Sequence, residues 1–147
     1  MTVVAEILKS KPDAVVYRIA PTDTVYDGLR LMADKGIGAL LVMEGDAIVG
    51  IVTERDYARK IALMGRTSVE TLVRDVMTPS VLCVRSTQTS DQCMQLMTGK
   101  RLRHLPVVDD GKLLGMISIG DLVKDIISEQ KFIIEQLEHY ITGGSRH

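Results

Sequence analysis

Two stretches of the sequence place a hydroxyl side chain three residues before an aspartate. Thr53 precedes Asp56 and Ser118 precedes Asp121, and each pair follows a glycine and two apolar residues. A hydroxyl at the end of a strand and a carboxylate in the first turn of the next helix point into the same crevice. There the carboxylate can accept hydrogen bonds from a ribose diol, and the hydroxyl and the helix N-terminus favour a phosphate. The same spacing also describes a capping box, in which the two residues only bond to each other and to backbone.

The two stretches occupy equivalent places in an internal repeat. When the sequence is shifted by 65 residues, segments 15–57 and 80–122 align without a gap, and ten of the 43 pairs are identical. Residues 4–8 resemble residues 73–77 at an offset of 69, so the first copy carries four extra residues around positions 9–13. Packing symmetry accounts for the apolar identities, but the recurrence of hydroxyl and aspartate favours a function.

Each copy predicts the order strand, helix, strand, strand, helix. Thr24 and Thr89 precede the first helix of each copy, where a threonine hydroxyl can accept a hydrogen bond from a free backbone amide. The turns between the last two strands are rich in glycine and aspartate, as in hairpins. The predicted strands are residues 15–19, 39–43 and 47–53 in the first copy, and 81–84, 104–108 and 112–118 in the second.

One such unit cannot cover its own sheet, whereas two copies related by a pseudo-twofold axis bury both faces. The predicted fold class is therefore α/β (α+β), with two pseudosymmetric β-α-β-β-α repeats packed as one body and a long C-terminal helix. The boundaries are predicted at 3–64 for the first repeat, 68–129 for the second and 130–147 for a helix extension with a frayed tail.

The long helix is expected at about 121–141, ending before Gly143-Gly144, and carries an apolar stripe flanked by charge. An apolar face that extends past a domain is more often a partner surface than a solvent-facing one. The stripe therefore predicts a homodimer contact or a docking helix. The alternative is that the helix packs back on its own repeat.

Composition excludes several classes of function. Hydrophobic residues make up 46% of the chain and the net charge is −1, so the protein has an ordinary globular composition without a general attraction to nucleic acid or anionic membrane. No apolar run is long enough to cross a bilayer and no signal segment is evident, which predicts a cytoplasmic protein. Cys83 and Cys93 do not match a metal pattern and are expected to be small core residues. No set of residues suggests catalysis or a metal site, so an enzyme is not expected.

Three motifs carry a resemblance to a known family. They are Val-Arg-Asp-Val-Met-Thr-Pro at 73–79, Arg-His-Leu-Pro-Val-Val at 103–108, and a motif that recurs at 50–56 and 115–121. This last motif is a glycine, two apolar residues, a threonine or serine, two variable residues and an aspartate. Together they resemble the CBS-domain pair, or Bateman module, over about residues 3–129. The resemblance implies a disc of two repeats that commonly dimerises. It also implies clefts for AMP, ADP, ATP, NAD or S-adenosylmethionine, with AMP favoured, and a regulatory role in signal transduction through the dimer or an unidentified partner protein.

The resemblance also assigns roles to residues. Asp56 and Asp121 are expected to bind ribose. The expected phosphate contacts are Thr53, Arg55, Arg103, His104 and Ser118. The expected adenine pockets are formed by Val16, Tyr17, Ile37, Met77, Leu82, Cys83 and Leu102.

In this family a cleft combines the base pocket of one repeat with the aspartate of the other. Arg103 and His104 would then join Arg55 near Asp56, whereas the cleft of Asp121 would lack these cations. The resemblance thus predicts two unequal sites, of which the Asp56 site prefers the more strongly phosphorylated ligand. A different class of function stays open: a ligand-independent module that uses the fold only for dimerisation or assembly.

Overall fold

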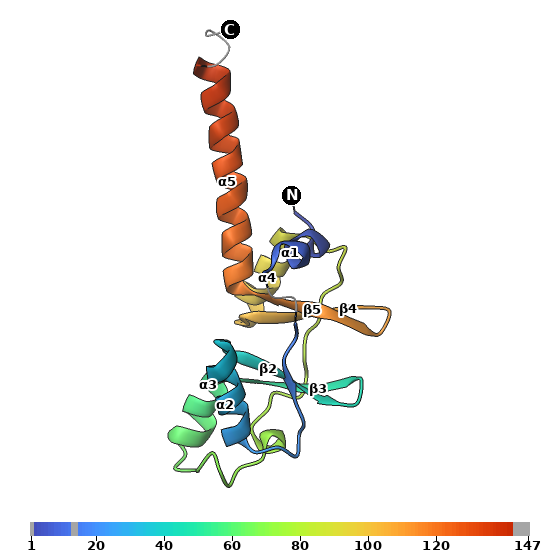
Figure 1. Cartoon of the computed structure of the whole chain (residues 1–147), viewed down its shortest axis with the longest axis vertical. Coiled ribbons are helices and arrows are strands. Elements are labelled where there is room, and N and C mark those ends of the chain that lie inside the picture. The colour runs from blue at the N-terminus through green and yellow to red at the C-terminus, as the bar shows by residue number, and fades with distance from the viewer. Residues whose placement is uncertain (1, 13–14, 143–147) are drawn as a thin grey trace. The chain divides into compact units, whose positions relative to one another are not determined.

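The computed structural model describes residues 2–12 and 15–142, and Figure 1 shows the order of its elements. The chain divides into two compact units. The first-repeat unit comprises residues 15–82. The second-repeat unit comprises residues 83–147 together with the N-terminal residues 1–14.

The first-repeat unit is built on a small sheet in the order β1-β2-β3. The short β1 pairs parallel with β2, and β2 pairs antiparallel with β3 across a two-residue turn that contains Gly45 in the left-handed region. Side chains from the sheet, the helices and the 3-10 turn η2 form one apolar core. The elements are β1 (Arg18–Ile19), α2 (Val25–Lys35), β2 (Ala39–Glu44), β3 (Ala47–Thr53), α3 (Glu54–Asp56), the π-helical η1 (Tyr57–Ala62) and η2 (Val73–Asp75).

The second-repeat unit has the same plan with one strand fewer. β4 and β5 form an antiparallel hairpin, and its turn places Asp110 and Gly111 at positive φ, as a two-residue hairpin turn requires. A core of its own forms beneath the hairpin. The elements are α1 (Val4–Ser10), α4 (Ser90–Lys100), β4 (His104–Asp109), β5 (Lys112–Ser118) and α5 (Ile119–Thr142).

The N-terminal helix α1 packs against the second repeat, and η2 takes the equivalent place on the first. In the second-repeat unit the amides of Val4 and Ala5 donate to the carbonyls of Gln88 and Ser86. In the first-repeat unit the amides of Val73 and Arg74 donate to the carbonyls of Asp23 and Pro21 at the matching positions of the other copy. The N-terminal segment with α1 thus belongs to the second-repeat unit, although it precedes the first repeat in the sequence.

Glycines in the hairpins allow these segments to pack closely. A Cβ on Gly50 would lie 2.5 Å from Sδ of Met77, just after η2. A Cβ on Gly115 would lie 2.7 Å from Cδ2 of Leu8 in α1. The recurrence of this glycine in both copies therefore has a packing cause.

Most predicted elements are confirmed, but the first strand of each copy is shorter than expected. β1 spans only Arg18–Ile19, which pair with Leu41 and Val42 of β2, and the carbonyl of Tyr17 just before it accepts the amide of Leu41 at 3.4 Å. In place of the predicted strand at 81–84, Val84 forms an isolated parallel bridge to Val107. The four hairpin strands, both threonine N-caps and the mixed α/β class with a long C-terminal helix are confirmed. The predicted helix end at Gly143-Gly144 and the tail lie outside the described residues.

Candidate functional site

Both hydroxyl–aspartate pairs form capping boxes. The Thr53 amide donates to Oδ2 of Asp56 at 2.9 Å, and the Asp56 amide donates back to the Thr53 hydroxyl at 3.2 Å. The Ser118 amide donates to Oδ2 of Asp121 at 2.8 Å, and the Asp121 amide donates to the Ser118 hydroxyl at 3.2 Å. The sequence therefore fixes these carboxylates at a strand–helix junction by local hydrogen bonds, and capping is one function of both pairs.

Each aspartate also has a lysine partner that the sequence analysis missed. Lys60 Nζ lies 3.3 Å from Oδ1 of Asp56 and donates to the Val76 carbonyl at 2.8 Å. Lys11 Nζ lies 3.0 Å from Oδ2 of Asp121 and donates to the carbonyl of Met116 at 2.7 Å. The aspartate side chains are 13% and 16% exposed, so both carboxylates reach the surface while a backbone amide and a lysine hold each of them.

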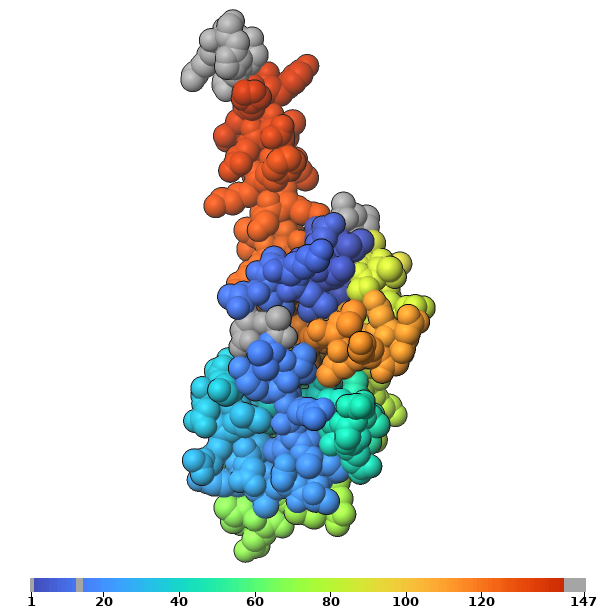
Figure 2. Space-filling model, turned by 45° about the vertical axis from the view of Figure 1, so that its right-hand side comes forward, coloured from blue at the N-terminus to red at the C-terminus, as the bar shows by residue number. Residues whose placement is uncertain are grey.

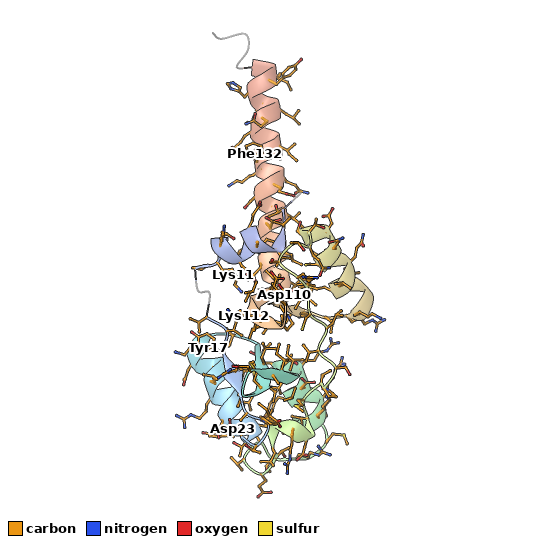
Figure 3. All side chains as sticks on the ribbon, turned by 90° about the vertical axis from the view of Figure 1, so that its right-hand side faces the viewer. Lys11, Tyr17, Asp23, Asp110, Lys112 and Phe132 are labelled. Atoms are coloured by element: carbon orange, nitrogen blue, oxygen red, sulfur yellow. The ribbon has the colours of Figure 1, made fainter. Side chains whose placement is uncertain are left out.

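The two lysines come from different places in the chain. Lys60 stands four residues after Asp56, a spacing typical of helical ion pairs that the sequence analysis could have used. Lys11 follows α1 (Figure 3), within the four residues by which the first copy exceeds the second. No local pattern links Lys11 to Asp121, because the contact depends on the packing of α1 against β5.

His104 lies beside the second aspartate. It begins β4 and is paired in register with Ser118 on β5. Burial lowers the pKa of His104 from its ordinary value of 6.5, and Lys11 and Arg103 lower it further, while the negative charge of Asp121 acts in the opposite direction. The Asp121 carboxylate is therefore surrounded by cationic or titratable groups within its own unit. The position equivalent to His104 is Ala39, opposite Thr53.

The two arginines predicted to contact phosphate are exposed. Arg55 lies in α3, one residue before Asp56. Arg103 precedes β4, and its carbonyl accepts the amide of Ile119 at 2.9 Å, as the carbonyl of Gly38 accepts the amide of Glu54 in the other unit. In each unit this backbone hydrogen bond ties the residue before the first hairpin strand to the start of the following helix. It does not depend on the side chain at position 103 or 38.

The predicted adenine-pocket residues are mostly half-buried. Tyr17, Ile37 and Met77 pack against the core of the first-repeat unit, and Lys35 Nζ lies 5.4 Å from the Tyr17 ring centroid. Val16 is half-buried, Leu82 is exposed, and Leu102 packs against the other core. The prediction that both cysteines are core residues is correct for Cys93 and wrong for Cys83, which is partly exposed because its strand is reduced to one bridge. Burial raises the pKa of both thiols.

The structure brings Ser118, Asp121, His104 and Arg103 together in one unit and Thr53, Arg55 and Asp56 in the other. The crossed combination of the base pocket of one repeat with the aspartate of the other stays a prediction. Among residues 2–12 and 15–142, no group of three histidine, cysteine, aspartate or glutamate side chains could hold a metal ion. The same part of the chain has no helix with the length and apolar character needed to span a membrane.

Comparison with known proteins identifies the repeats. The family model of the CBS domain matches residues 4–63 and 73–128. The CBS domain-containing protein CBSX3, mitochondrial, of Arabidopsis thaliana is 40% identical over 151 residues, which cover 97% of this chain and 73% of that protein. The chain also matches protein MK0525 of Methanopyrus kandleri, with 35% identity, and spans 60% of its length.

Solved structures of proteins with CBS domains also resemble this chain. A Burkholderia ambifaria structure with CBS domains, described as a signal-transduction protein, has 58% identity and a TM-score of 0.85, and the match covers 88% of this chain and 96% of that one. CBSX2, solved in complex with AMP, has 27% identity and a TM-score of 0.71 over 88% of this chain and 99% of that one. The family model matches two successive segments that together cover most of the chain. The chain therefore belongs to the CBS-domain family as a tandem pair of CBS repeats.

Proposed function

We propose that this chain is a non-catalytic regulatory module that binds an adenine nucleotide, with Asp56 and Asp121 accepting hydrogen bonds from ribose hydroxyls. The observation that carries the proposal is the recurrence, in both units, of a partly exposed carboxylate fixed beside a strand end and a helix N-terminus. Capping alone needs no such exposure and no repeated lysine. The complex of CBSX2 with AMP supports the choice of ligand class.

AMP is the first candidate, and ADP, ATP, NAD and S-adenosylmethionine are the others. The predicted phosphate contacts, Arg55 and Arg103, are exposed side chains that a phosphate can reach without unfolding either unit. The signal leaves the module through a homodimer contact or a regulated partner protein. The cytoplasmic location predicted from the sequence belongs to the same proposal, although the Arabidopsis relative is named mitochondrial.

Thermal unfolding of ligand-stripped protein with each of the five compounds in excess tests the proposal. A ligand that binds only the folded state stabilises it by about 2.7 kcal/mol at a hundredfold excess over its dissociation constant. We expect a rise in Tm with at least one compound, and the rise should be lost in Asp56→Ala or Asp121→Ala.

The chain offers a matched control for the loss of a cap. Thr89 and Gln92 form a third capping box, at the start of α4 and away from the predicted site. Gln92→Ala should lower the Tm of the free protein as the aspartate variants do, yet keep the full shift with ligand. If Gln92→Ala and the aspartate variants lost the shift equally, the aspartates would act only as caps.

A second function has an observation in its favour. Each of the two carboxylates already has a backbone amide and a lysine as partners, and that of Asp56 also accepts a hydrogen bond from the Thr53 hydroxyl, so neither needs a ligand to be satisfied. A ligand-independent assembly module would have the same geometry. It predicts that none of the five compounds changes the Tm.

A further inference from the structure

Helix α5 begins inside the second-repeat unit, and its C-terminal half is exposed. Leu122, in its first turn, is fully buried, and the hydroxyl of Thr2 donates to Oε1 of Glu129 at 2.8 Å. From Gln130 to Ile141 every residue is exposed. On the face visible in Figure 2, no other described segment of the second-repeat unit is packed around this part of α5.

The exposed part is strongly apolar. Isolated helices shorter than about 12 to 15 residues are marginal in water, and large apolar patches on soluble proteins mark interaction sites. Large apolar side chains recur in pairs along α5, from the half-buried Ile126 with the exposed Ile127 to the exposed pairs Ile133 with Ile134 and Tyr140 with Ile141. We call these residues, together with Leu137, the α5 stripe.

The spacing of the α5 stripe identifies the kind of partner. Each pair follows the previous one by seven residues, and Val123, Gln130 and Leu137 form a third row with the same interval. A strict seven-residue repeat keeps one face of a helix against a partner that supercoils around it with the same repeat. The other helices in the described part of the chain have at most 11 residues, too short to match it.

From this spacing we propose that the α5 stripe is a coiled-coil interface with α5 of a second copy of the chain. A second copy has the required repeat by identity. Gln130 is the only polar residue in its row, and its amide carries both a donor and acceptors, so it can pair with its own symmetry mate. A single polar residue of this kind sets the register of a coiled coil.

The charges at the edges of the α5 stripe also fit a second copy. Glu129 and Lys131 lie on opposite edges of the stripe, one turn or less from Gln130. In a parallel pair aligned at Gln130, opposite edges lie side by side, so Lys131 of each helix lies on the same flank as Glu129 of the other and not beside a like charge. The inference extends the dimer contact of the proposed function to a named surface and does not depend on nucleotide binding.

Phe132 provides a matched control. It is 61% exposed, compared with 54% for Ile134, but the helical turn of 3.6 residues places it on the opposite side of α5. The test is sedimentation equilibrium of the full chain without nucleotide. It compares wild type, the double variant Ile134→Glu with Leu137→Glu, and Phe132→Glu, with circular dichroism to verify folding.

We expect a self-associating wild type, a dissociation constant raised at least tenfold in the double variant, and a constant for Phe132→Glu close to that of the wild type. A monomeric wild type at every concentration would overturn the proposal. So would a double variant that associates as the wild type does, since another surface would then hold the oligomer. Because no nucleotide is present, these results are independent of the thermal-shift experiment.

Discussion

Lys11 and Lys60 each form an ion pair with one of the recurring aspartates, but their side chains differ in burial. The Lys11 side chain is 23% exposed and links the end of α1 to β5, whereas the Lys60 side chain is 43% exposed and links Asp56 to the carbonyl of Val76. Breaking a partly buried ion pair costs more than breaking an exposed pair at helical spacing. We predict that Lys11→Met lowers the free energy of unfolding by about 1–2 kcal/mol and Lys60→Met by less than about 1 kcal/mol.

Urea unfolding at neutral pH measures both changes. Methionine keeps most of the apolar stem of lysine, so the comparison isolates the ammonium group. A larger loss for Lys60→Met than for Lys11→Met would contradict the role given to α1 in fixing Asp121.

His104 predicts a pH dependence. Because burial lowers its pKa below 6.5 in the folded chain, the folded state binds a proton less readily than the unfolded state. The contribution of neutral His104 is therefore fully present above pH 6.5 and is lost as the pH falls through that value toward the folded pKa. Stability of the wild type should fall more steeply between pH 7 and about 5 than that of His104→Gln. Parallel pH profiles of the two proteins would argue against a buried, neutral imidazole.

At the scale of elements, the hairpin glycines differ in what they face. A Cβ on Gly50 meets Met77 and also the carbonyl oxygen of Thr78 at 3.1 Å, which accepts the amide of Ile51. The three atoms nearest to a Cβ on Gly115 all belong to the flexible side chain of Leu8. Overpacking costs about 1–3 kcal/mol where neighbours cannot move. Gly50→Ala should therefore destabilise the chain by an amount in this range, and Gly115→Ala by clearly less, as chemical unfolding will show.

The elements that local patterns define were predictable. Thr24 and Thr89 act as caps, and the hairpins end where glycine and aspartate make the turn. The first strands of the copies were predicted too long, because an apolar run at 15–19 or 81–84 does not by itself create a complete ladder with the neighbouring strand. Which residues pair is decided by the neighbouring β2 and β4.

At the scale of the whole molecule, the repeat was evident from the sequence, but the grouping of its parts was not. The echo of residues 4–8 in residues 73–77 shows that α1 and η2 are equivalent. It does not show that α1 packs on the second copy, since both copies offer the same carbonyl acceptors. The Lys11–Asp121 contact follows from that packing, and so the cation beside Asp121 could not be predicted.

The central claim is that the recurring aspartates bind an adenine nucleotide, and isothermal titration of AMP into ligand-stripped full chain tests it most directly. We predict saturable binding that is weakened at least tenfold, about 1.4 kcal/mol, in Asp56→Ala or Asp121→Ala and is unchanged in Gln92→Ala. Absence of binding by AMP and the four related compounds, or binding that both aspartate variants retain in full, would contradict the claim.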